Sequence, residues 1–424
     1  MSLMVSQELA LSQDKEEVFT QPRYYERFRC IGAACEDTCC QGWGVFVDKA
    51  TYQKYQICGD SELSAKLKEL VTIRPAGSDL LYASISSPGG RCSFLTGGLC
   101  SIQKRLGDEY LGHVCATYPR VLNTSGNRRE RSLDLSCPEA ARLALLDPAR
   151  MDFGATAEET IDGVRKLILS LLQNRAYAVF KRLILVGMVC GEWRTLEGSS
   201  ASPEGKARFL EDFATAVSGK QYDAYLASCV ADPVTQLSTV LDLMVARLRM
   251  DYTSPRYRSI CREFADGLGL KSGAVDWEEV GARYFDAYHG YYVPFFETHE
   301  YVLEHYLVAY AFKTRFPFGA PPVNRILDLE RSVDPFVAQY LLLAAYFSVV
   351  KAVMIGLAAF HKGEFSAEHV VRAIQSISKT LEHCEPYPLR VIEVLGRNGI
   401  RDCVGMSLLA ADVVRRDEGA NLLL

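Results

Sequence analysis

Apolar and polar positions follow two different patterns along this chain, and the pattern changes near residue 138. Beyond that point, apolar residues recur every three to four positions through residues 161–189, 206–217 and 234–249. This spacing places one face of an α-helix against a core. The same spacing, interrupted by prolines that end helices, predicts later helices over residues 275–315, 335–360, 366–384, 388–397 and 402–416.

The first 140 residues show shorter and more varied elements. Residues 44–48 and 80–85 have the composition of short strands, and residues 48–55 and 62–70 have a helical pattern. Residues 92–100 have the glycine-centred pattern of a small hairpin with a cysteine at each end. Glycine pairs break any longer element in this part of the chain.

Together these patterns predict a mainly α protein in two parts. We expect an N-terminal tail over residues 1–22, a cysteine-rich, loop-rich metal module with short β-hairpins over residues 23–140, and a larger all-helical domain over residues 141–424 on which the module packs. A chain of 424 residues can bury a sizeable core without disulfides. Stability alone therefore does not account for its cysteines.

Residues 336–360 are apolar enough to raise the question of a membrane span. Gln339 and Lys351 interrupt the run, and a lysine near the centre of a bilayer is costly. A buried core helix is therefore favoured, and no membrane span is expected. The N-terminus lacks the basic region, apolar run and cleavage site of a secretion signal, which predicts a cytoplasmic protein.

The charge pattern excludes some partners. The chain has 47 basic and 52 acidic residues, so it offers no basic field for a phosphate backbone, and nucleic acid is not expected as a partner. The run Arg128, Arg129, Glu130 and Arg131 predicts a solvated turn. The glycine-rich residues 267–273 follow a helical segment, which predicts a helix C-cap turn and not a Rossmann nucleotide loop.

The cysteines carry the strongest chemical signal. Nine of the fourteen fall between Cys30 and Cys137, and thiols stay reduced in the cytoplasm, which favours metal binding over disulfides. The predicted metal ligands are Cys30, Cys35, Cys39, Cys40, Cys92, Cys100, Cys115 and Cys137. Cys58 is expected to be peripheral. The other five are expected to pack as small apolar side chains, namely Cys190, Cys229, Cys261, Cys384 and Cys403.

Two kinds of centre fit this ligand set. Two all-cysteine zinc sites would use all eight thiolates, whereas a four-iron cluster would use only four, and spacing does not choose between them. Adjacent Cys39 and Cys40 are expected to point apart, because neighbouring side chains diverge on helices and strands. His113 is interpreted as an ordinary side chain in preference to a ligand. Apolar neighbours that would shield the centre are Trp43, Tyr118 and Pro119.

The longer string around these cysteines resembles a known family. It reads RFRCIGAACEDTCCQGW over residues 27–43 and is followed by VDK at residues 47–49 and CATYP at residues 115–119. With LEHYLVAYAFKTRFPF over residues 303–318, it resembles the bacterial flagellin lysine-N-methylase family. That family belongs to a wider group with a CxxCxxCC-type zinc- or iron-chelating segment.

The resemblance implies a protein-lysine N-methyltransferase. Such an enzyme moves methyl groups from S-adenosylmethionine to lysine side chains of flagellin and carries a cysteine-bound iron–sulfur centre, expected here as 4Fe-4S. The catalytic residues and the methyl-donor pocket are not located by it. Because Cys35 and Cys39 are followed at once by Cys40, the run is not the Cys-x3-Cys-x2-Cys arrangement of radical S-adenosylmethionine enzymes, and a radical mechanism is not supported.

Residues 284–318 are crowded with aromatic side chains. They could line a groove for a lysine stem, but core packing with the tyrosine hydroxyls toward solvent is favoured. In the groove interpretation, the groups that could accept the ammonium proton are Glu297, Glu300, Glu304, Tyr288, Tyr291 and Tyr292. His299 is followed four residues later by Leu303, so the helical zinc-protease motif is absent.

Two other functions stay open at this point. The N-terminal part could be a zinc-stapled module that binds a protein without catalysis, or the chain could be an iron–sulfur electron-transfer protein. Iron with acid-labile sulfide would separate a cluster from zinc. Methyl transfer from S-adenosylmethionine to flagellin would separate the enzyme from an electron carrier.

Overall fold

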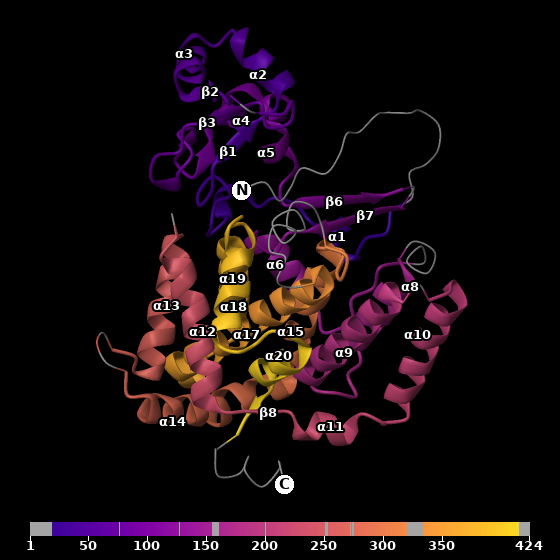
Figure 1. Cartoon of the computed structure of the whole chain (residues 1–424). Helices are drawn as coiled ribbons and strands as arrows, with labels where there is room; N and C mark the ends of the chain where they lie inside the picture. The colour runs from indigo at the N-terminus through magenta and orange to yellow at the C-terminus, as the bar shows by residue number, and fades with distance from the viewer. Residues whose placement is uncertain are drawn as a thin grey trace.

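The computed structural model describes residues 19–414 except residues 76, 127, 155–160, 200, 251–252, 272, 274 and 320–333. Most of the predicted tail and the end of the helix predicted over 402–416 therefore lie outside the described residues. Within them helices dominate, which confirms the prediction of a mainly α fold. Figure 1 shows β1 to β3 and α2 to α5 at one end of the molecule and the later helices as the larger body.

The helical body begins with α6 (Pro138–Leu145). Four of its helices start at a Ser or Asp whose side chain accepts a backbone N–H, followed by a proline that leaves no N–H unpaired. The further helices are α8 (Gly163–Leu172), α9 (Val179–Gly198), α10 (Pro203–Ser218), α11 (Asp223–Ser228), α12 (Pro233–Leu248), α13 (Pro255–Leu268), α14 (Trp277–Ala287), α15 (Val293–Lys313), α17 (Pro335–His361), α18 (Ala367–Ile377), α19 (Tyr387–Arg397) and α20 (Cys403–Ala410).

Some predicted helices are divided differently in the structure. The pattern over residues 161–189 is split between α8 and α9. Two π-helical turns, η4 (Tyr288–Tyr292) and η6 (Ser378–Glu382), extend α14 into α15 and continue α18. The last helix ends at Ala410, and its chain continues as β9 (Asp412–Val413), which pairs in parallel with β8 (Val230–Ala231). Gly269 caps α13 with φ 66°, which confirms the predicted C-cap turn.

The N-terminal part contains a small three-stranded antiparallel sheet. Its order is β1 (Val45–Val47), β3 (Ala83–Ile85) and β2 (Val71–Ile73). The helices beside it are α2 (Lys49–Gln56) and α3 (Ser61–Leu70), as predicted. The shorter helices of this part are α1 (Tyr24–Arg27), α4 (Ser101–Leu106) and α5 (His113–Thr117).

Two hairpins in this part differ from prediction. In the hairpin of β4 (Leu95–Thr96) and β5 (Leu99–Cys100), Cys100 pairs with Leu95, so Cys92 is not its partner across the strands. The solvated turn predicted at residues 128–131 is wrong, because β7 (Arg128–Leu133) pairs along its length with β6 (Arg120–Ser125). Glu130 points into the protein and binds the buried guanidinium of Arg165, which no local pattern announces.

Helix α17 forms the centre of the helical body. Within the described residues it is the one helix long and apolar enough to cross a membrane, and its apolar window is entirely buried by the rest of the protein. It is therefore a core helix here, as expected. It crosses α13 closely, because Gly267 of α13 lies directly against the backbone of Gly356.

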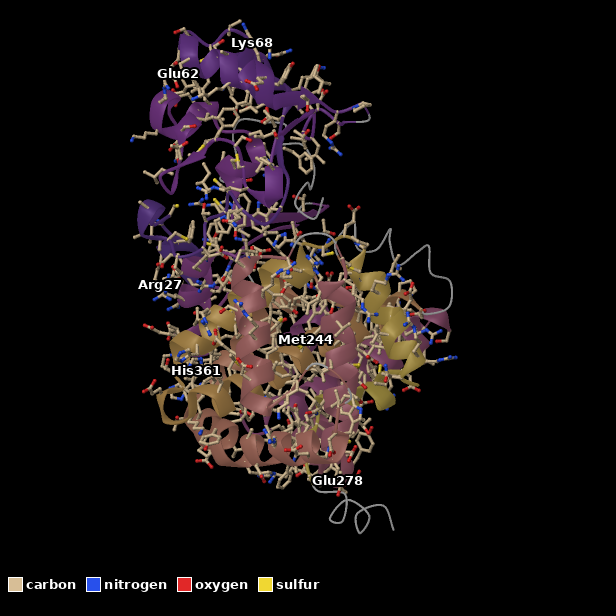
Figure 2. The ribbon with its side chains drawn as sticks, turned by 90° about the vertical axis from the view of Figure 1, so that its left-hand side faces the viewer. Arg27, Glu62, Lys68, Met244, Glu278 and His361 are labelled. Atoms are coloured by element: carbon tan, nitrogen blue, oxygen red, sulfur yellow. The ribbon has the colours of Figure 1, made fainter. Side chains whose placement is uncertain are left out.

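Two hydrophobic cores lie on either side of the junction. One is small and contains residues of β1 to β3 and their helices, such as Val47, Leu67 and Phe94. The other is much larger and extends from α1 and α6 through the helical body. Figure 2 shows Glu62 and Lys68 at the outer end of the small part and Met244 deep in the large one. We call the small part, residues 45–115, the cysteine module.

Candidate functional site

A cavity of about 370 Å³ lies between the cysteine module and the helical body. All eight cysteines predicted as metal ligands line it, although they are spread over more than a hundred residues of sequence. Cys58 does not line the cavity and packs against the module core, as expected for a peripheral residue. The five later cysteines are buried in or packed against the helical core, which confirms their interpretation as packing residues.

Short elements and turns bring the thiols to this cavity. Cys35 follows a single 3-10 turn, Gly32–Ala34. Cys40 is fixed to the next segment because its carbonyl accepts the Cys92 N–H at 2.9 Å. Cys115 lies in the middle of α5, and Cys137 is the N-cap residue of α6. Local backbone structure therefore positions these four thiols.

The thiols form two neighbourhoods. Cys40, Cys92, Cys100 and Cys115 all pack in or against the module core, and charge on one raises the pKa of another. Charge on Cys30 adds to burial in raising the pKa of Cys35, and charge on Cys35 and Cys30 adds to burial in raising the pKa of Cys137, which is the N-cap residue of α6 in the helical body. Cys39 lies between the two neighbourhoods, beside Cys40, Cys115 and Cys30.

Cys39 and Cys40 do not point apart as predicted. Their side chains hydrogen-bond to each other and both line the cavity. The residues lie in a turn, where the alternation of helices and strands does not apply. This hydrogen bond, followed by burial, raises the pKa of Cys39. The same hydrogen bond lowers the pKa of Cys40, and the positive charge of Lys379 lowers it further.

Burial makes the other thiols poor anions when they are free. Burial first, and then charge on Cys40 and Cys100, raises the pKa of Cys92 to about 11. Burial first, and then charge on Cys35 and Cys30, raises the pKa of Cys137 to about 11. Metal ligands must be thiolates, and a bound cation supplies the charge that makes buried thiolates stable. The donor set therefore has the chemistry of a metal or iron–sulfur site.

The geometry of a finished metal shell is not present in the described residues. Across the described ranges, no group of three or more Cys, His, Asp or Glu side chains is arranged so that it could hold a metal ion as it stands. The metal centre thus stays a prediction, supported by the shared cavity and by the chemistry of the thiols.

Aromatic side chains cover one wall of the cavity. Trp43 packs edge-on against Tyr118, with ring centroids 5.3 Å apart, and against His383 at 5.0 Å. The Tyr118 hydroxyl lies 3.0 Å from Ser136 Oγ. Trp43, Tyr118 and Pro119 all line the cavity, where the sequence predicted shielding residues.

The helical body contributes a set of polar residues that the sequence analysis missed. Gln375 of α18 donates to Asp37 Oδ2 at 2.8 Å and to the Ser136 carbonyl at 2.7 Å. Lys379 of η6 donates to Asp37 Oδ1 at 2.9 Å and to the Thr38 carbonyl at 3.0 Å. The sequence signal for this pair was the spacing of Gln375 and Lys379, two polar side chains four residues apart on an otherwise buried helix.

A buried charge network supports this wall. Lys313, at the end of α15, binds Asp134 Oδ2 at 2.9 Å and also binds Glu382. Burial alone would raise the pKa of Asp134, but Lys313 and then His383 hold it well below its usual range. Asp134 therefore remains a carboxylate inside the protein.

The groove interpretation of residues 284–318 is not supported. Tyr284 and Tyr288 are buried, and their hydroxyls donate to Gln236 and Asp412 inside the protein and not toward solvent. The favoured prediction of core packing is therefore confirmed, but its second part, hydroxyls directed at solvent, is wrong for Tyr284 and Tyr288. Tyr291 remains exposed, and Tyr292 is buried.

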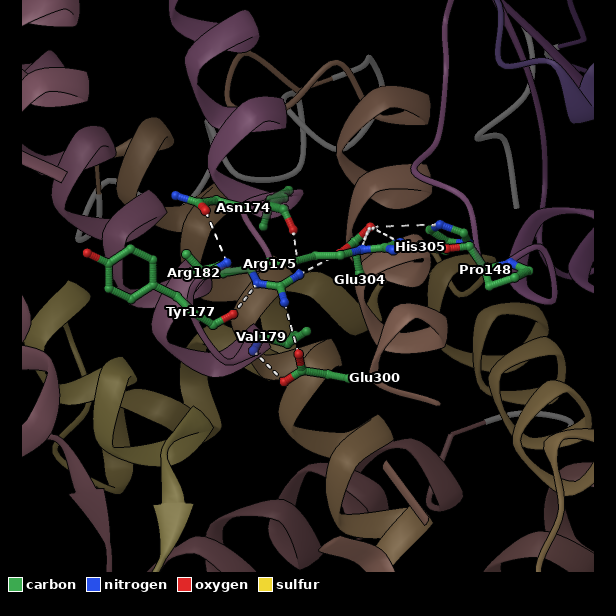
Figure 3. Close-up of polar contacts among 11 residues, drawn as sticks. Pro148, Asn174, Arg175, Tyr177, Val179, Arg182, Glu300, Glu304 and His305 are labelled. Carbon is green, nitrogen blue, oxygen red and sulfur yellow. Dashed lines mark hydrogen bonds and ion pairs between the residues drawn. The ribbon is translucent and has the colours of Figure 1, made fainter. Parts of the chain in front are cut away.

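Two of the proposed proton acceptors are engaged in structural ion pairs. Glu304 is fully buried and binds Arg182 at 2.6 Å and Arg175 at 2.9 Å. Glu300 binds Arg182 at 2.9 Å and accepts the Val179 N–H at the start of α9. Figure 3 shows this network. Their carboxylates hold helices together and lie outside the cavity lining.

Comparison with known proteins gives the following matches. Residues 165–409 match the family described as FliB lysine N-methylase C-terminal domain. Over 149 residues, 35% of this chain, it is 36% identical to the Lysine-N-methylase of Salmonella typhimurium strain LT2, covering 36% of that protein. The Lysine-N-methylase of Salmonella choleraesuis is 35% identical over the same length and share.

A third relative is covered more completely. The Flagellar biosynthetic protein FliU of Salmonella muenchen is 34% identical over 142 residues, 33% of this chain and 84% of that protein. The match thus spans about a third of the length of the two lysine-N-methylases. No solved structure is significantly similar to this one. The family match includes Gln375, Lys379 and His383, all on the helical side of the cavity.

Proposed function

The chain belongs to the FliB lysine N-methylase family, and from that membership we propose that it is a protein-lysine N-methyltransferase. One structural observation carries the proposal. The region that matches the family and the cysteine-rich region meet at one cavity, where His383 from the first and eight thiols from the second form the lining. The region that matches the family therefore borders the same cavity as the cysteine-rich region.

We propose flagellin as the protein substrate. A relative of which 84% is matched is named a flagellar biosynthetic protein, and the sequence resembles the flagellin lysine-N-methylase family. We place the reaction in the cytoplasm, because the cysteine-rich region keeps nine cysteines from Cys30 to Cys137 unjoined by disulfides and cytosolic conditions keep thiols reduced.

We propose S-adenosylmethionine as the methyl donor. In the reaction the bond between the methyl carbon and the sulfonium sulfur breaks, and the sulfur keeps the electron pair. A new bond forms between that carbon and the lysine nitrogen, and S-adenosylhomocysteine leaves. The lysine must be a neutral amine to attack, whereas a free lysine with a pKa near 10.4 is almost wholly protonated at about pH 7.

We propose that the cysteines hold an iron–sulfur cluster, expected as 4Fe-4S. Cys40, Cys92, Cys100 and Cys115 fit this role best, because they are neighbours and all lie in or against the module core. When bound, such a cluster would supply an electron-transfer or Lewis-acid centre. The remaining predicted ligands, Cys30, Cys35, Cys39 and Cys137, lie nearer to the helical body.

The test combines metal analysis with an activity assay. Protein purified without oxygen is assayed for iron, acid-labile sulfide and zinc, and is then incubated with flagellin and isotopically labelled S-adenosylmethionine. We expect about four irons and four sulfides per chain, and label on flagellin lysines by mass spectrometry. Stoichiometric zinc with no transfer would support the zinc-stapled module. Reversible reduction with no transfer would support an electron-transfer protein.

A further inference from the structure

One histidine stands apart from the other six. Across the described residues, His383 is the histidine that lines the cavity, and its side chain is only 11% exposed. It follows the π-helical turn η6 directly, and such turns occur often at functional sites. Its ring lies against that of Trp43, with the ring centroids 5.0 Å apart.

The hydrogen bonds of His383 define its tautomer. Nε2 lies 3.2 Å from Asp134 Oδ1 and 3.2 Å from Ser136 Oγ. A carboxylate only accepts, so Nε2 carries a ring proton, and in the neutral form of the ring Nδ1 carries the lone pair. Among the described residues, no hydrogen-bond partner occupies Nδ1. As in a catalytic triad, a buried carboxylate that binds one ring nitrogen therefore fixes the orientation of the His383 ring.

The contacts of Asp134 stabilise its ionised carboxylate. Its Oδ1 also accepts the Ser136 N–H at 2.9 Å, and its Oδ2 binds Lys313. The other titratable groups around His383 are Lys313 from α15, Lys379 and Glu382 from η6, Asp37 beside Lys379, and, along the cavity, Tyr118, Cys39 and Cys40.

The same wall already accommodates a lysine ammonium. Lys379 Nζ lies 5.2 Å from the centroid of Trp43, in cation–π range. The apolar faces of Phe28, Trp43 and Tyr118 also line the cavity and suit the methylene stem of a second lysine. An amine that enters beside Trp43 therefore meets His383.

We propose that His383 is the catalytic base of the methyl transfer, accepting at Nδ1 the proton of the substrate lysine ammonium, and that Asp134 is its positioning residue. This proposal rests on the proposed function. The proton moves from the lysine nitrogen to Nδ1, the amine lone pair then attacks the methyl carbon, and the sulfonium sulfur takes the electron pair. The imidazolium returns its proton to solvent after the product leaves.

The first experiment measures kcat/KM for methyl transfer to flagellin between about pH 6 and about pH 9.5, with iron content recorded for each variant. We expect His383→Gln to lower kcat/KM about 100-fold or more near pH 7. The deficit should shrink at high pH, where about tenfold more free amine appears per pH unit. His113→Gln is the matched control, because His113 lies in the cysteine module but not on the cavity, and it should retain the wild-type profile.

The second experiment separates catalysis from packing. Added imidazole should restore a large part of the activity of His383→Ala. The control His113→Gln should be fully active without added imidazole. Asp134→Asn should lower kcat with little change in KM, because the carboxylate no longer holds the imidazole ring in place. A merely structural role would lower the rate equally at every pH and would not respond to imidazole.

The outcomes separate the two proposals. If the wild-type protein transfers no methyl group, the proposed function fails and the role of His383 falls with it. If the wild-type protein is active and iron-loaded His383→Gln and His383→Ala keep its profile, or lose activity evenly without rescue, only the role of His383 is overturned. His383→Gln keeps a hydrogen-bonding side chain of similar length, so one of the two variants remains folded for the comparison.

Discussion

The cysteine module and the helical body bury polar groups in opposite ways. In the helical body each buried charge described above has its partner, as with Arg182 and Glu304 or Arg165 and Glu130. In the module, thiols such as Cys92 and Cys115 lie beside one another, and burial first, then charge on neighbouring cysteines, raises their pKa values. These charges of the helical body are thus balanced by protein partners, whereas the module has the composition of a fold that gains stability from a cation.

The largest effect should come from removing the metal that we propose for the module. Structural metal sites contribute about 10 kcal/mol or more to folding, so Cys115→Ala should abolish bound iron and lower methyl transfer at least about 100-fold. Hydrogen exchange should then increase throughout β1 to β3 and remain unchanged in α17. Visible absorption, iron content and exchange by mass spectrometry check this.

Cys58→Ala is the matched control for that experiment. Cys58 belongs to the same module and packs against its core, but it does not line the cavity. It should keep iron and activity. Equal loss of iron in both variants would show that the module responds to cysteine loss in general and not to loss of a ligand.

The next largest effect concerns the buried ion pairs of the helical body. Arg182→Met leaves Glu304 buried with part of its partner set gone, and breaking such a pair costs about 3–5 kcal/mol. Arg208→Met, which removes an exposed pair with Asp212, should change the free energy of unfolding by about 0.5 kcal/mol or less. Urea denaturation measures both. Similar values for the two variants would contradict the view that the helical body depends on paired internal charges.

A smaller effect is expected at the crossing of α13 and α17. A methyl group on Gly267 would overlap the backbone carbonyl of Gly356, so Gly267→Ala should destabilise the protein by about 1–3 kcal/mol. Gly191→Ala in α9 meets nothing within 4 Å and should stabilise it by about 0.5–1 kcal/mol. Thermal denaturation should show opposite shifts in Tm, and shifts of the same sign would refute the close crossing.

The smallest effect is the acid response of the junction between the two parts. The pKa of Asp134 lies well below its usual range in the folded protein, so its stabilisation is present above about pH 5 and is lost as the pH falls through the folded-state pKa. This single group adds at most about 1.4 kcal/mol per pH unit in that window. Asp134→Asn should flatten the dependence of unfolding free energy on pH below about pH 5, and an unchanged slope would exclude Asp134 as the source.

The sequence predicted what local patterns control. Apolar spacing located α10 and α12 closely, and spacing together with the proline break at Pro335 located α17, because these signals lie within a few residues of each helix. The density of cysteines predicted that eight thiols would gather, and they line one cavity. The helix positions depend on features within a few dozen residues. The gathering of thiols could be predicted because cysteine is a residue type with few other uses.

The missed features depend on distant partners. Glu130 belongs to a strand and not to a turn because Arg165 neutralises it from α8. His383 joins the cavity because Asp134, about 250 positions earlier, binds its ring. Nothing near His383 in the sequence announces that contact. Glu300 and Glu304 looked like free carboxylates for the converse reason, since Arg182 is more than a hundred residues away.

The π-helical turn η6 has a consequence for how this wall could change. A π-turn holds one residue more than the α-helix around it. If the same residues from Ser378 to Glu382 wound as an ordinary α-helix instead, the chain after them would be rotated by about 100° about the helix axis. The chain would still contain His383 and all eight thiols, yet the imidazole would swing away from Trp43. The winding of this turn, and not only the identity of the residues, therefore decides which side chain faces the cavity lined by the cysteines.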